Sequence, residues 1–520
     1  YTDAYSSGTT NITAGAYLYK TTNELGKTTT YGHYLATGAP SSVTDAKGNK
    51  TTYTYTDNTH TKLLNVTSGN TKVAYSYTGN RTSQILFSGT SDSKKETYKF
   101  NYDAFGNVTQ TLVGTKALVT NIYGTNNGVL QQSNYANGDA IRYQYNNAGL
   151  VTGIFQDNNA TSQYRTFSWD YSSNGTPRVH KDGYTGLRYD YSYDTIGRLI
   201  RTDISNSSSY AQVGSTEYGY DLRNNLTSIS NDVGGMTYLQ KYSYSGLGTD
   251  NSVAAAKDNL PTQYSVLGKS TTYTYNTLNQ LTNRTVDTTT DISSSYVYNT
   301  VTLEGVKHYT NQLNCETLNG TSYHYTYDDL GNITAIKKGT GYGTTTSAYK
   351  SYGYDNKYQL TQETKGTTVN TWEYDDLGNI ESKTTKVNGT ATNAISYTYG
   401  TDSDCGWENL LTKLSFTNYA NNTTTTQTID YDAIGNPITY RGSTLSWYGR
   451  QMKSFAKNGI TSTMTYDADG LRSSKTVAGV KTTYQYVGDK LFYENRGNGD
   501  SFYYFYDSYG KLSAIYHHRN

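Results

Sequence analysis

One short motif recurs along nearly the whole chain and constrains its fold more than any other feature. It consists of Tyr, then Asp, two variable residues and Gly. The complete copies are Tyr102-Asp103-Ala104-Phe105-Gly106, Tyr193-Asp194-Thr195-Ile196-Gly197, Tyr327-Asp328-Asp329-Leu330-Gly331, Tyr374-Asp375-Asp376-Leu377-Gly378, Tyr431-Asp432-Ala433-Ile434-Gly435, Tyr466-Asp467-Ala468-Asp469-Gly470 and Tyr506-Asp507-Ser508-Tyr509-Gly510. Degenerate copies lie between them, so the underlying unit is roughly 20–27 residues long. Such a period predicts a repeat architecture instead of several unrelated globular domains.

Each copy of the motif predicts a hairpin turn. Asp favours the first position of a type I turn, because its side chain accepts hydrogen bonds from the backbone ahead of it. Gly three residues later supplies the positive φ that closes such a turn with a bulge. Asn224 and Asn279 occupy the Gly position in two degenerate copies, and Asn is the usual second choice for that backbone conformation.

The residues before each turn alternate as the residues of a strand do. Tyr recurs at every second position in several runs, such as Tyr189, Tyr191 and Tyr193. Residues two apart share one face of a strand, so Tyr would line one face and the Ser and Thr between would line the other. We therefore predict an all-β fold of tandem antiparallel β-hairpins that pair edge to edge into a long curled ribbon. The one short segment with some helical character is Val253 to Lys257.

The composition agrees with a repeat that buries Tyr instead of aliphatic side chains. Hydrophobic residues make up only 34% of the chain, and 58 residues are Tyr. Tyr buries a large ring but needs a partner for its hydroxyl, which favours thin layers with polar edges. The 43 basic and 42 acidic residues give a formal net charge of +1 without a basic stripe, so nucleic-acid binding is not expected. No apolar stretch is long enough to span a membrane.

The residues offer no catalytic, metal or cofactor constellation. Asp328-Asp329 and Asp375-Asp376 are tempting pairs of carboxylates, but neighbours on a turn point apart, and turn capping explains them better than an acid dyad. Asp467-Ala468-Asp469-Gly470 comes nearest to a calcium loop, yet it fits the repeat turn without an ion. The seven histidines lack metal-ligand spacing. We therefore expect no enzymatic activity, no metal and no cofactor.

The chain has two cysteines, Cys315 and Cys405, and they form no framework pattern. Two isolated thiols are the favoured interpretation, and a disulfide between them is the alternative. The composition is poor in Cys and rich in Asn and Thr, which suits bacterial surface proteins.

The repeats resemble the rearrangement-hotspot (Rhs) or YD-repeat family, which includes bacterial wall-associated proteins, toxin-complex shells and the animal teneurins. The resemblance covers essentially all 520 residues, and Val43-Thr44-Asp45-Ala46-Lys47-Gly48-Asn49 is similar to the family's longer repeat form. It implies a ribbon that spirals into a hollow shell, which commonly holds a C-terminal toxin or effector until delivery. In teneurins a similar shell serves adhesion.

The sequence departs from this family in one respect that concerns closure of the shell. The family's closing core segment carries an Asp-Pro pair, whereas the four prolines of this chain follow Ala39, Thr176, Leu260 and Asn436. We therefore predict one continuous repeat array over residues 1–520, in which 484–520 are the last repeats before a core segment and a cargo that this stretch lacks.

Four tryptophans are candidates for stacking on sugars: Trp169, Trp372, Trp407 and Trp447. Packing within the repeats is the favoured explanation, because Trp372 and Trp447 replace Tyr at strand positions. The sequence thus supports two hypotheses on function. The first is a non-catalytic shell segment of a secreted or surface bacterial protein, whose partner is a C-terminal toxin or effector. The alternative is a cell-surface adhesin or carbohydrate-binding repeat protein, whose partner is a glycan or the cell wall.

Overall fold

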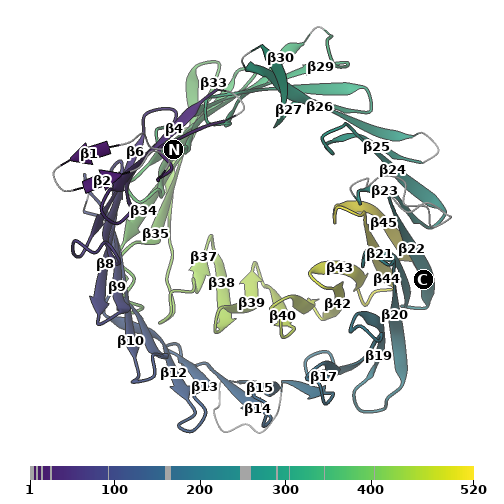
Figure 1. Cartoon of the computed structure of the whole chain (residues 1–520). Coiled ribbons are helices and arrows are strands. Elements are labelled where there is room, and N and C mark those ends of the chain that lie inside the picture. Colours follow the sequence, from purple (N-terminus) through teal and green to yellow (C-terminus); the bar gives the residue numbers. More distant parts are fainter. Residues whose placement is uncertain are drawn as a thin grey trace. The chain divides into compact units, whose positions relative to one another are not determined.

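The computed structural model describes residues 5–7, 10–12, 16–23, 26–91, 93–157, 166–245, 259–287, 291–303, 305–344, 346–402 and 404–519. Its regular elements are β-strands that follow one another in chain order as antiparallel hairpins (Figure 1). The predicted all-β fold of tandem hairpins is therefore confirmed. The described residues contain no helix of the length and apolarity that a membrane crossing requires. The segment Val253 to Lys257 lies outside the described residues.

The chain divides into two compact units, each made of two segments that are far apart in the sequence. Unit 1 comprises residues 1–118 and 295–437. The strands of its first segment are β1 (Tyr5–Ser7), β2 (Thr10–Ile12), β3 (Lys20–Thr22), β4 (Thr28–Tyr34), β5 (Ala39–Thr44), β6 (Lys50–Tyr55), β7 (Leu63–Ser68), β8 (Thr71–Thr78), β9 (Arg81–Gly89), β10 (Lys95–Tyr102) and β11 (Val108–Val113). The strands of its second segment are β27 (Val306–Leu318), β28 (Thr321–Tyr327), β29 (Ile333–Gly339), β30 (Ser347–Tyr354), β31 (Leu360–Lys365), β32 (Thr368–Tyr374), β33 (Ile380–Val387), β34 (Thr390–Gly400), β35 (Leu410–Asn418) and β36 (Thr423–Thr428).

Unit 2 comprises residues 119–294 and 438–520. The strands of its first segment are β13 (Leu130–Tyr135), β14 (Ala140–Tyr145), β15 (Val151–Asp157), β16 (Phe167–Tyr171), β17 (Pro177–Asp182), β18 (Leu187–Tyr193), β19 (Leu199–Asn206), β20 (Gln212–Tyr220), β21 (Leu226–Val233), β22 (Met236–Tyr244), β23 (Pro261–Val266), β24 (Lys269–Tyr275) and β25 (Leu281–Val286). The strands of its second segment are β37 (Thr439–Tyr440), β38 (Ser443–Tyr448), β39 (Gln451–Lys457), β40 (Ile460–Tyr466), β41 (Arg472–Val477), β42 (Val480–Val487), β43 (Lys490–Asn495), β44 (Asp500–Tyr506) and β45 (Leu512–Arg519). The strands β12 (Lys116–Tyr123) and β26 (Ile292–Leu303) cross the borders of the units. The single continuous array over 1–520 stays a prediction, as does the place of 484–520 before a core segment.

The hairpins share a β-bulge at the repeat tyrosine. Strands β10 and β11 pair in register from Tyr98 and Val113 as far as Asn101 and Gln110, after which the register shifts and Tyr102 pairs with Val108. The same shift precedes Tyr193, Tyr327, Tyr374, Tyr466 and Tyr506. A bulge adds one residue to one strand and increases the local twist. These six repeats therefore enter their turns with the same local distortion, whereas Tyr431 forms an isolated bridge with Pro437.

Unit 2 has an aromatic core between its two segments. Alternate residues of β44 are buried, and Tyr503 and Phe505 are fully enclosed. The ring of Tyr238, from β22, meets both of them edge-on at centroid distances of 5.6 and 4.9 Å. The Tyr503 hydroxyl donates a hydrogen bond of 3.2 Å to the carbonyl of Val233. This core uses Tyr largely as an apolar side chain, since the hydroxyl of Tyr503 has a backbone partner while that of Tyr238 makes no hydrogen bond to the described residues.

Unit 1 joins its two segments mainly through polar side chains. Glu96, on β10, and the neighbouring residues Asp375 and Asp376, in the turn after β32, are all buried. A buried carboxylate is costly unless it is hydrogen-bonded or paired with a charge. The contacts that satisfy these groups form part of the candidate functional site.

Candidate functional site

In each complete copy of the repeat turn, Oδ1 of the aspartate accepts backbone N–H groups. In the first, Asp103 Oδ1 accepts the N–H groups of Phe105 and Asn107, both at 2.9 Å, and Asp103 Oδ2 accepts the Asn107 side-chain amide at 2.9 Å. Gly106 donates its N–H to the Asp103 carbonyl and has a φ of 99°. This φ is costly for a residue with a Cβ, which explains Gly at that position.

In every complete copy, the backbone N–H of the residue four positions after the aspartate donates a hydrogen bond to that aspartate. The distance from that N–H to Oδ1 is 2.8 to 3.0 Å in the turns of Asp103, Asp194, Asp328, Asp375, Asp432, Asp467 and Asp507. The turn glycines have positive φ at Gly106, Gly197, Gly331, Gly378, Gly435, Gly470 and Gly510. The turn is therefore a local unit, built from five consecutive residues.

The turn hydrogen bonds stabilise the ionised aspartate. The Asn107 amide is the main reason why the pKa of Asp103 lies below its usual range, and backbone N–H groups add to the effect. At Asp328, burial alone would raise the pKa, but hydrogen bonds from Lys47, Asn332 and the backbone lower it to about 2. Hydrogen bonds to a charged carboxylate favour the charged form. The turns of Asp103 and Asp328 consequently hold negative charges at neutral pH.

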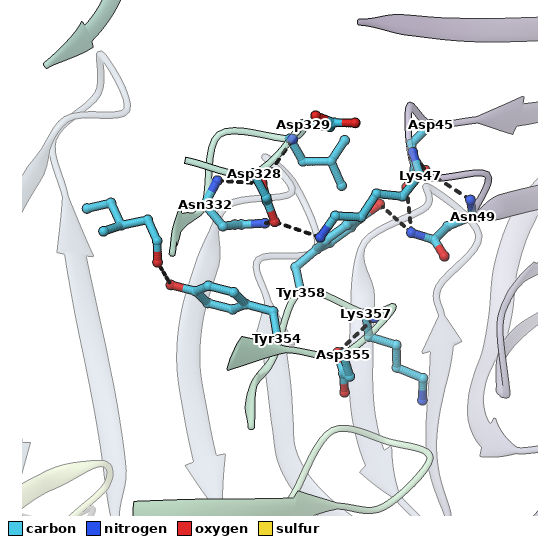
Figure 2. Close-up of polar contacts among 12 residues, drawn as sticks. Asp45, Lys47, Asn49, Asp328, Asp329, Asn332, Tyr354, Asp355, Lys357 and Tyr358 are labelled. Atoms are coloured by element: carbon cyan, nitrogen blue, oxygen red, sulfur yellow. Dashed lines mark hydrogen bonds and ion pairs between the residues drawn. The ribbon is translucent and has the colours of Figure 1, made fainter. Parts of the chain in front are cut away.

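Most repeat tyrosines link their hairpin to the one before it. The Tyr374 hydroxyl donates to the carbonyl of Leu360 at 2.8 Å, and Leu360 is the first residue of β31, directly after the preceding turn. Tyr354 makes the same bond to Ile333 at 2.9 Å (Figure 2). Equivalent bonds are made by Tyr102, Tyr327, Tyr431 and Tyr466. Within the described residues, the hydroxyls of Tyr193 and Tyr506 make no such bond.

Within unit 1, turns and strands that are far apart in the sequence meet in what we call the unit 1 seam, the contacts of residues 27–97 with residues 328–409. Lys47 Nζ lies 2.6 Å from Asp328 Oδ2 (Figure 2). Lys27 pairs with Asp329 at 2.8 Å. In this doubled motif, Asp328 caps the turn, while Asp329 pairs with Lys27 from the other segment of unit 1.

The other doubled aspartate, in the turn after β32, repeats this arrangement. Lys94 Nζ lies 3.0 Å from Asp375 Oδ2 and 2.8 Å from Glu381 Oε1. Asp376 Oδ2 accepts the backbone N–H of Ser91 at 2.7 Å and its hydroxyl at 2.6 Å. The sequence motif predicts the doubled aspartates as turn caps, but it gives no sign of these long-range contacts.

A third part of the seam surrounds Glu96. Its carboxylate accepts the N–H groups of Glu408 and Asn409, each at 3.2 Å. Thr97 donates its hydroxyl to Glu408 Oε2 at 2.8 Å. Burial raises the pKa of Glu96, while these backbone N–H groups act in the opposite direction. The unit 1 seam is therefore a line of charged and hydrogen-bonded groups and not an apolar interface.

The four tryptophans lie in four different hairpins: Trp169 in β16, Trp372 in β32, Trp407 in the turn before β35, and Trp447 in β38. Lys383 Nζ lies over the Trp372 ring at 5.5 Å from its centroid. The Trp407 ring meets Tyr98 edge-on at 5.9 Å, within unit 1. These contacts place the two rings in packing within the repeats. Stacking of the tryptophans on sugars stays a prediction.

The remaining reactive side chains are separate from one another. Cys315 and Cys405 are both buried free thiols. Burial raises the pKa of Cys405 to about 12, so this thiol stays protonated at neutral pH. In the part of the chain that the structure describes, no group of three His, Cys, Asp or Glu side chains is arranged to hold a metal.

No family model and no curated protein matches the chain. Solved structures do match it. The crystal structure of TcdB2-TccC3-Cdc42 aligns with a TM-score of 0.52 and 13% identity over 95% of this chain and 27% of that chain. The crystal structure of TcdB2-TccC3-TEV aligns with a TM-score of 0.42 and 13% identity over 95% of this chain and 29% of that chain. A mutant Photorhabdus luminescens Tc holotoxin pore aligns with a TM-score of 0.32 and 13% identity over 94% of this chain and 34% of that chain.

The first of these alignments shows that this chain shares its fold with part of the chain in the TcdB2-TccC3-Cdc42 crystal structure. The chain spans about a quarter of the length of that solved chain.

Proposed function

We propose that this chain is a structural segment of a secreted bacterial shell of the Rhs or YD-repeat type, which encloses and helps to deliver a toxin or effector. The observation that supports this most directly is the alignment of 95% of the chain with TcdB2-TccC3-Cdc42. The repeat turns and tyrosine links support a wall made of serial hairpins, in which each repeat is stabilised by its neighbours.

The unit 1 seam supports a wall rather than an extended filament. A repeat array whose units contact only their neighbours would leave Lys47 and Asp328 apart, since 281 residues separate them. Ion pairs that are partly shielded from water are worth more than exposed ones. Side-by-side packing of distant hairpins is the arrangement that a wall around a cargo needs.

An unfolded reporter polypeptide fused to the C-terminus of the chain tests this proposal. If the chain encloses a polypeptide attached at this end, a protease should cut the fused reporter more slowly than the free reporter. A matched fusion should lose this protection when Asp328, Asp375 and Asp376 are replaced with Ala. Cleavage of the fused reporter at the rate of the free one would contradict enclosure.

We also propose that the chain has no catalytic role of its own. The carboxylates that the sequence offers for catalysis cap turns or pair with Lys, as Asp328 and Asp375 do. Incubation of the purified chain with peptidoglycan tests this directly, since a hydrolase would release soluble fragments. Release that persists after purification to homogeneity would contradict the proposal.

A further inference from the structure

A cavity of about 290 Å³ lies within unit 2, between the hairpins of β16–β20 and the turn and strands that span residues 467–492. Its lining includes three carboxylates, those of Asp182, Asp467 and Asp469. Trp169 and Tyr189 are among the aromatic side chains around them. No residue of this lining is Lys or Arg. The lining therefore combines aromatic faces with three carboxylates, while the cations Lys481 and Arg472 act on it from outside.

Asp467 differs from the other repeat aspartates in how it is held. Its Oδ1 accepts the N–H groups of Asp469 and Leu471, as the turn requires. Leu471 stands where four turns have an Asn that donates to Oδ2, as Asn332 does to Asp328. In the two other turns without this Asn, Oδ2 of Asp194 contacts Arg198 and Oδ2 of Asp507 contacts Arg284. Within the described residues, Asp467 Oδ2 accepts no hydrogen bond, so it is free to bind a ligand. Burial raises the pKa of Asp467, whereas the pKa of Asp328 is lowered.

Whereas Asp467 is half-buried, Asp182, at the end of β17, supplies the buried carboxylate of the cavity. Its Oδ1 accepts the N–H of Tyr184 at 2.8 Å and the N–H of Thr185 at 3.3 Å. Burial raises its pKa, and Lys481 acts on it from an exposed position outside the lining. A carboxylate buried without a close cation is unfavourable, and a bound cation would remove that cost.

His180 gives an independent indication that the cavity takes a ligand. The residue lines the cavity, is 9% exposed, and its Nδ1 makes no hydrogen bond to the described residues. Burial lowers the pKa of His180 to about 4, so the ring is uncharged at neutral pH and does not repel a cation. Its ring packs against Trp169, with 4.8 Å between the centroids. Buried polar atoms without partners are uncommon in folded proteins.

We propose that this cavity binds an organic cation, a guanidinium or a primary ammonium group of the kind that Arg and Lys side chains present. The carboxylates of Asp182 and Asp467 act as counter-charges, with Asp469 at the exposed rim. The ring face of Trp169 provides a cation–π contact, which favours a desolvated cation over a neutral group. This binding activity goes beyond the structural role proposed for the chain and does not depend on it.

Isothermal titration of the full chain tests the proposal with three probes. Agmatine represents a free guanidinium cation, acetyl-Gly-Arg-Gly-amide represents a basic peptide, and the same peptide with citrulline in place of Arg is its neutral counterpart. We expect at least one of the two cations to bind and the citrulline peptide to give no heat. Binding of agmatine assigns the site to small amines, and binding of the peptide alone assigns it to a polypeptide partner. Absence of binding by both cations, or equal binding of the citrulline peptide, would overturn the proposal.

Substitutions locate the binding to this cavity. Asp467→Asn should weaken cation binding about tenfold, because the charge is lost while Oδ1 still accepts the turn hydrogen bonds. Asp469→Asn should also weaken it and leaves the fold intact, since this side chain is exposed. The matched control is Asp103→Asn, which changes an equivalent turn in unit 1 and should leave binding unchanged. If Asp467→Asn and Asp469→Asn bind the cation as tightly as the unmodified chain does, the cavity is not the binding site.

Discussion

Lys47 Nζ lies 2.6 Å from Asp328 Oδ2, although 281 residues separate the two along the chain. Asp328 closes its own turn with Oδ1 and uses Oδ2 for both Asn332 and Lys47. One side chain therefore serves the local repeat and the contact between distant repeats. In a simple repeat array, each repeat is stabilised only by contacts with its neighbours along the chain. The Lys47–Asp328 pair adds a contact between repeats that are not neighbours along the chain.

Replacement of Asp328 with Asn should lower the free energy of unfolding of unit 1 by about 1–2 kcal/mol at neutral pH. The Asn side chain can still accept the backbone N–H groups with its oxygen, but its NH2 group cannot accept the Asn332 side-chain hydrogen bond or pair with Lys47. Urea denaturation followed by circular dichroism measures the change. Asp329→Asn removes a more exposed ion pair and should cost less. An equal loss in both variants would contradict a special role for Asp328.

The stabilisation by Asp328 should depend on pH in a defined direction. Its pKa is about 2 in the folded chain, below the value of about 4 for an unfolded Asp. A carboxylate with a depressed pKa stabilises the folded state above its unfolded pKa, and this contribution is lost as the pH falls through the folded pKa. The difference in unfolding free energy between the unmodified chain and Asp328→Asn should therefore shrink from about pH 4 downward. A difference that stays constant over this range would show that the carboxylate charge is not its source.

Removal of the Tyr374 hydroxyl, in Tyr374→Phe, should cost about 1 kcal/mol of stability. The substitution leaves the Leu360 carbonyl without its donor while keeping the ring in place. Tyr193→Phe is the matched control, because that hydroxyl makes no hydrogen bond to the described residues. Thermal denaturation of both variants gives the comparison. A loss at Tyr193 as large as that at Tyr374 would contradict the linking role of the hydroxyl.

Gly197→Ala should destabilise its hairpin by about 1–2 kcal/mol through the backbone alone. Gly197 has a φ of 87°, and a Cβ there would meet no other atom within 4 Å. Gly197→Asn should recover much of this loss, because Asn224 adopts a φ of 71° at the equivalent position. Hydrogen exchange of β18 and β19 reports on this hairpin. Equal rates of hydrogen exchange in Gly197→Ala and Gly197→Asn would show that the positive φ at this position is not the cause of the destabilisation.

Truncation of the unit 2 core, in Phe505→Ala, should cost about 3–5 kcal/mol, because the side chain is fully buried. Hydrogen exchange should increase in β21–β24, β43 and β44, whose residues form this core. Strands β28–β33 of unit 1 should keep their protection if stability is local, as in other repeat proteins. Simultaneous loss of protection in both units would show a single cooperative structure instead.

The sequence alone determined the turns and the strands. The Asp103–Asn107 turn is held by bonds within five residues, so the motif contains everything that it needs. Alternating Tyr likewise indicated which residues of each strand lie on the same face, since residues two apart must share a face. The all-β fold and the serial hairpins could be predicted from these local rules without knowledge of any long-range contact.

Only the tertiary structure decided which distant repeats meet. Nothing in the turn of Asp328 specifies Lys47, because the turn motif is the same in repeats that have no such partner. The same holds for Asp467: its missing Asn neighbour is visible in the sequence, but the cavity that it faces is formed by hairpins more than 200 residues earlier. Interactions within a turn are fixed by short-range geometry, whereas contacts between turns depend on how the hairpins pack side by side.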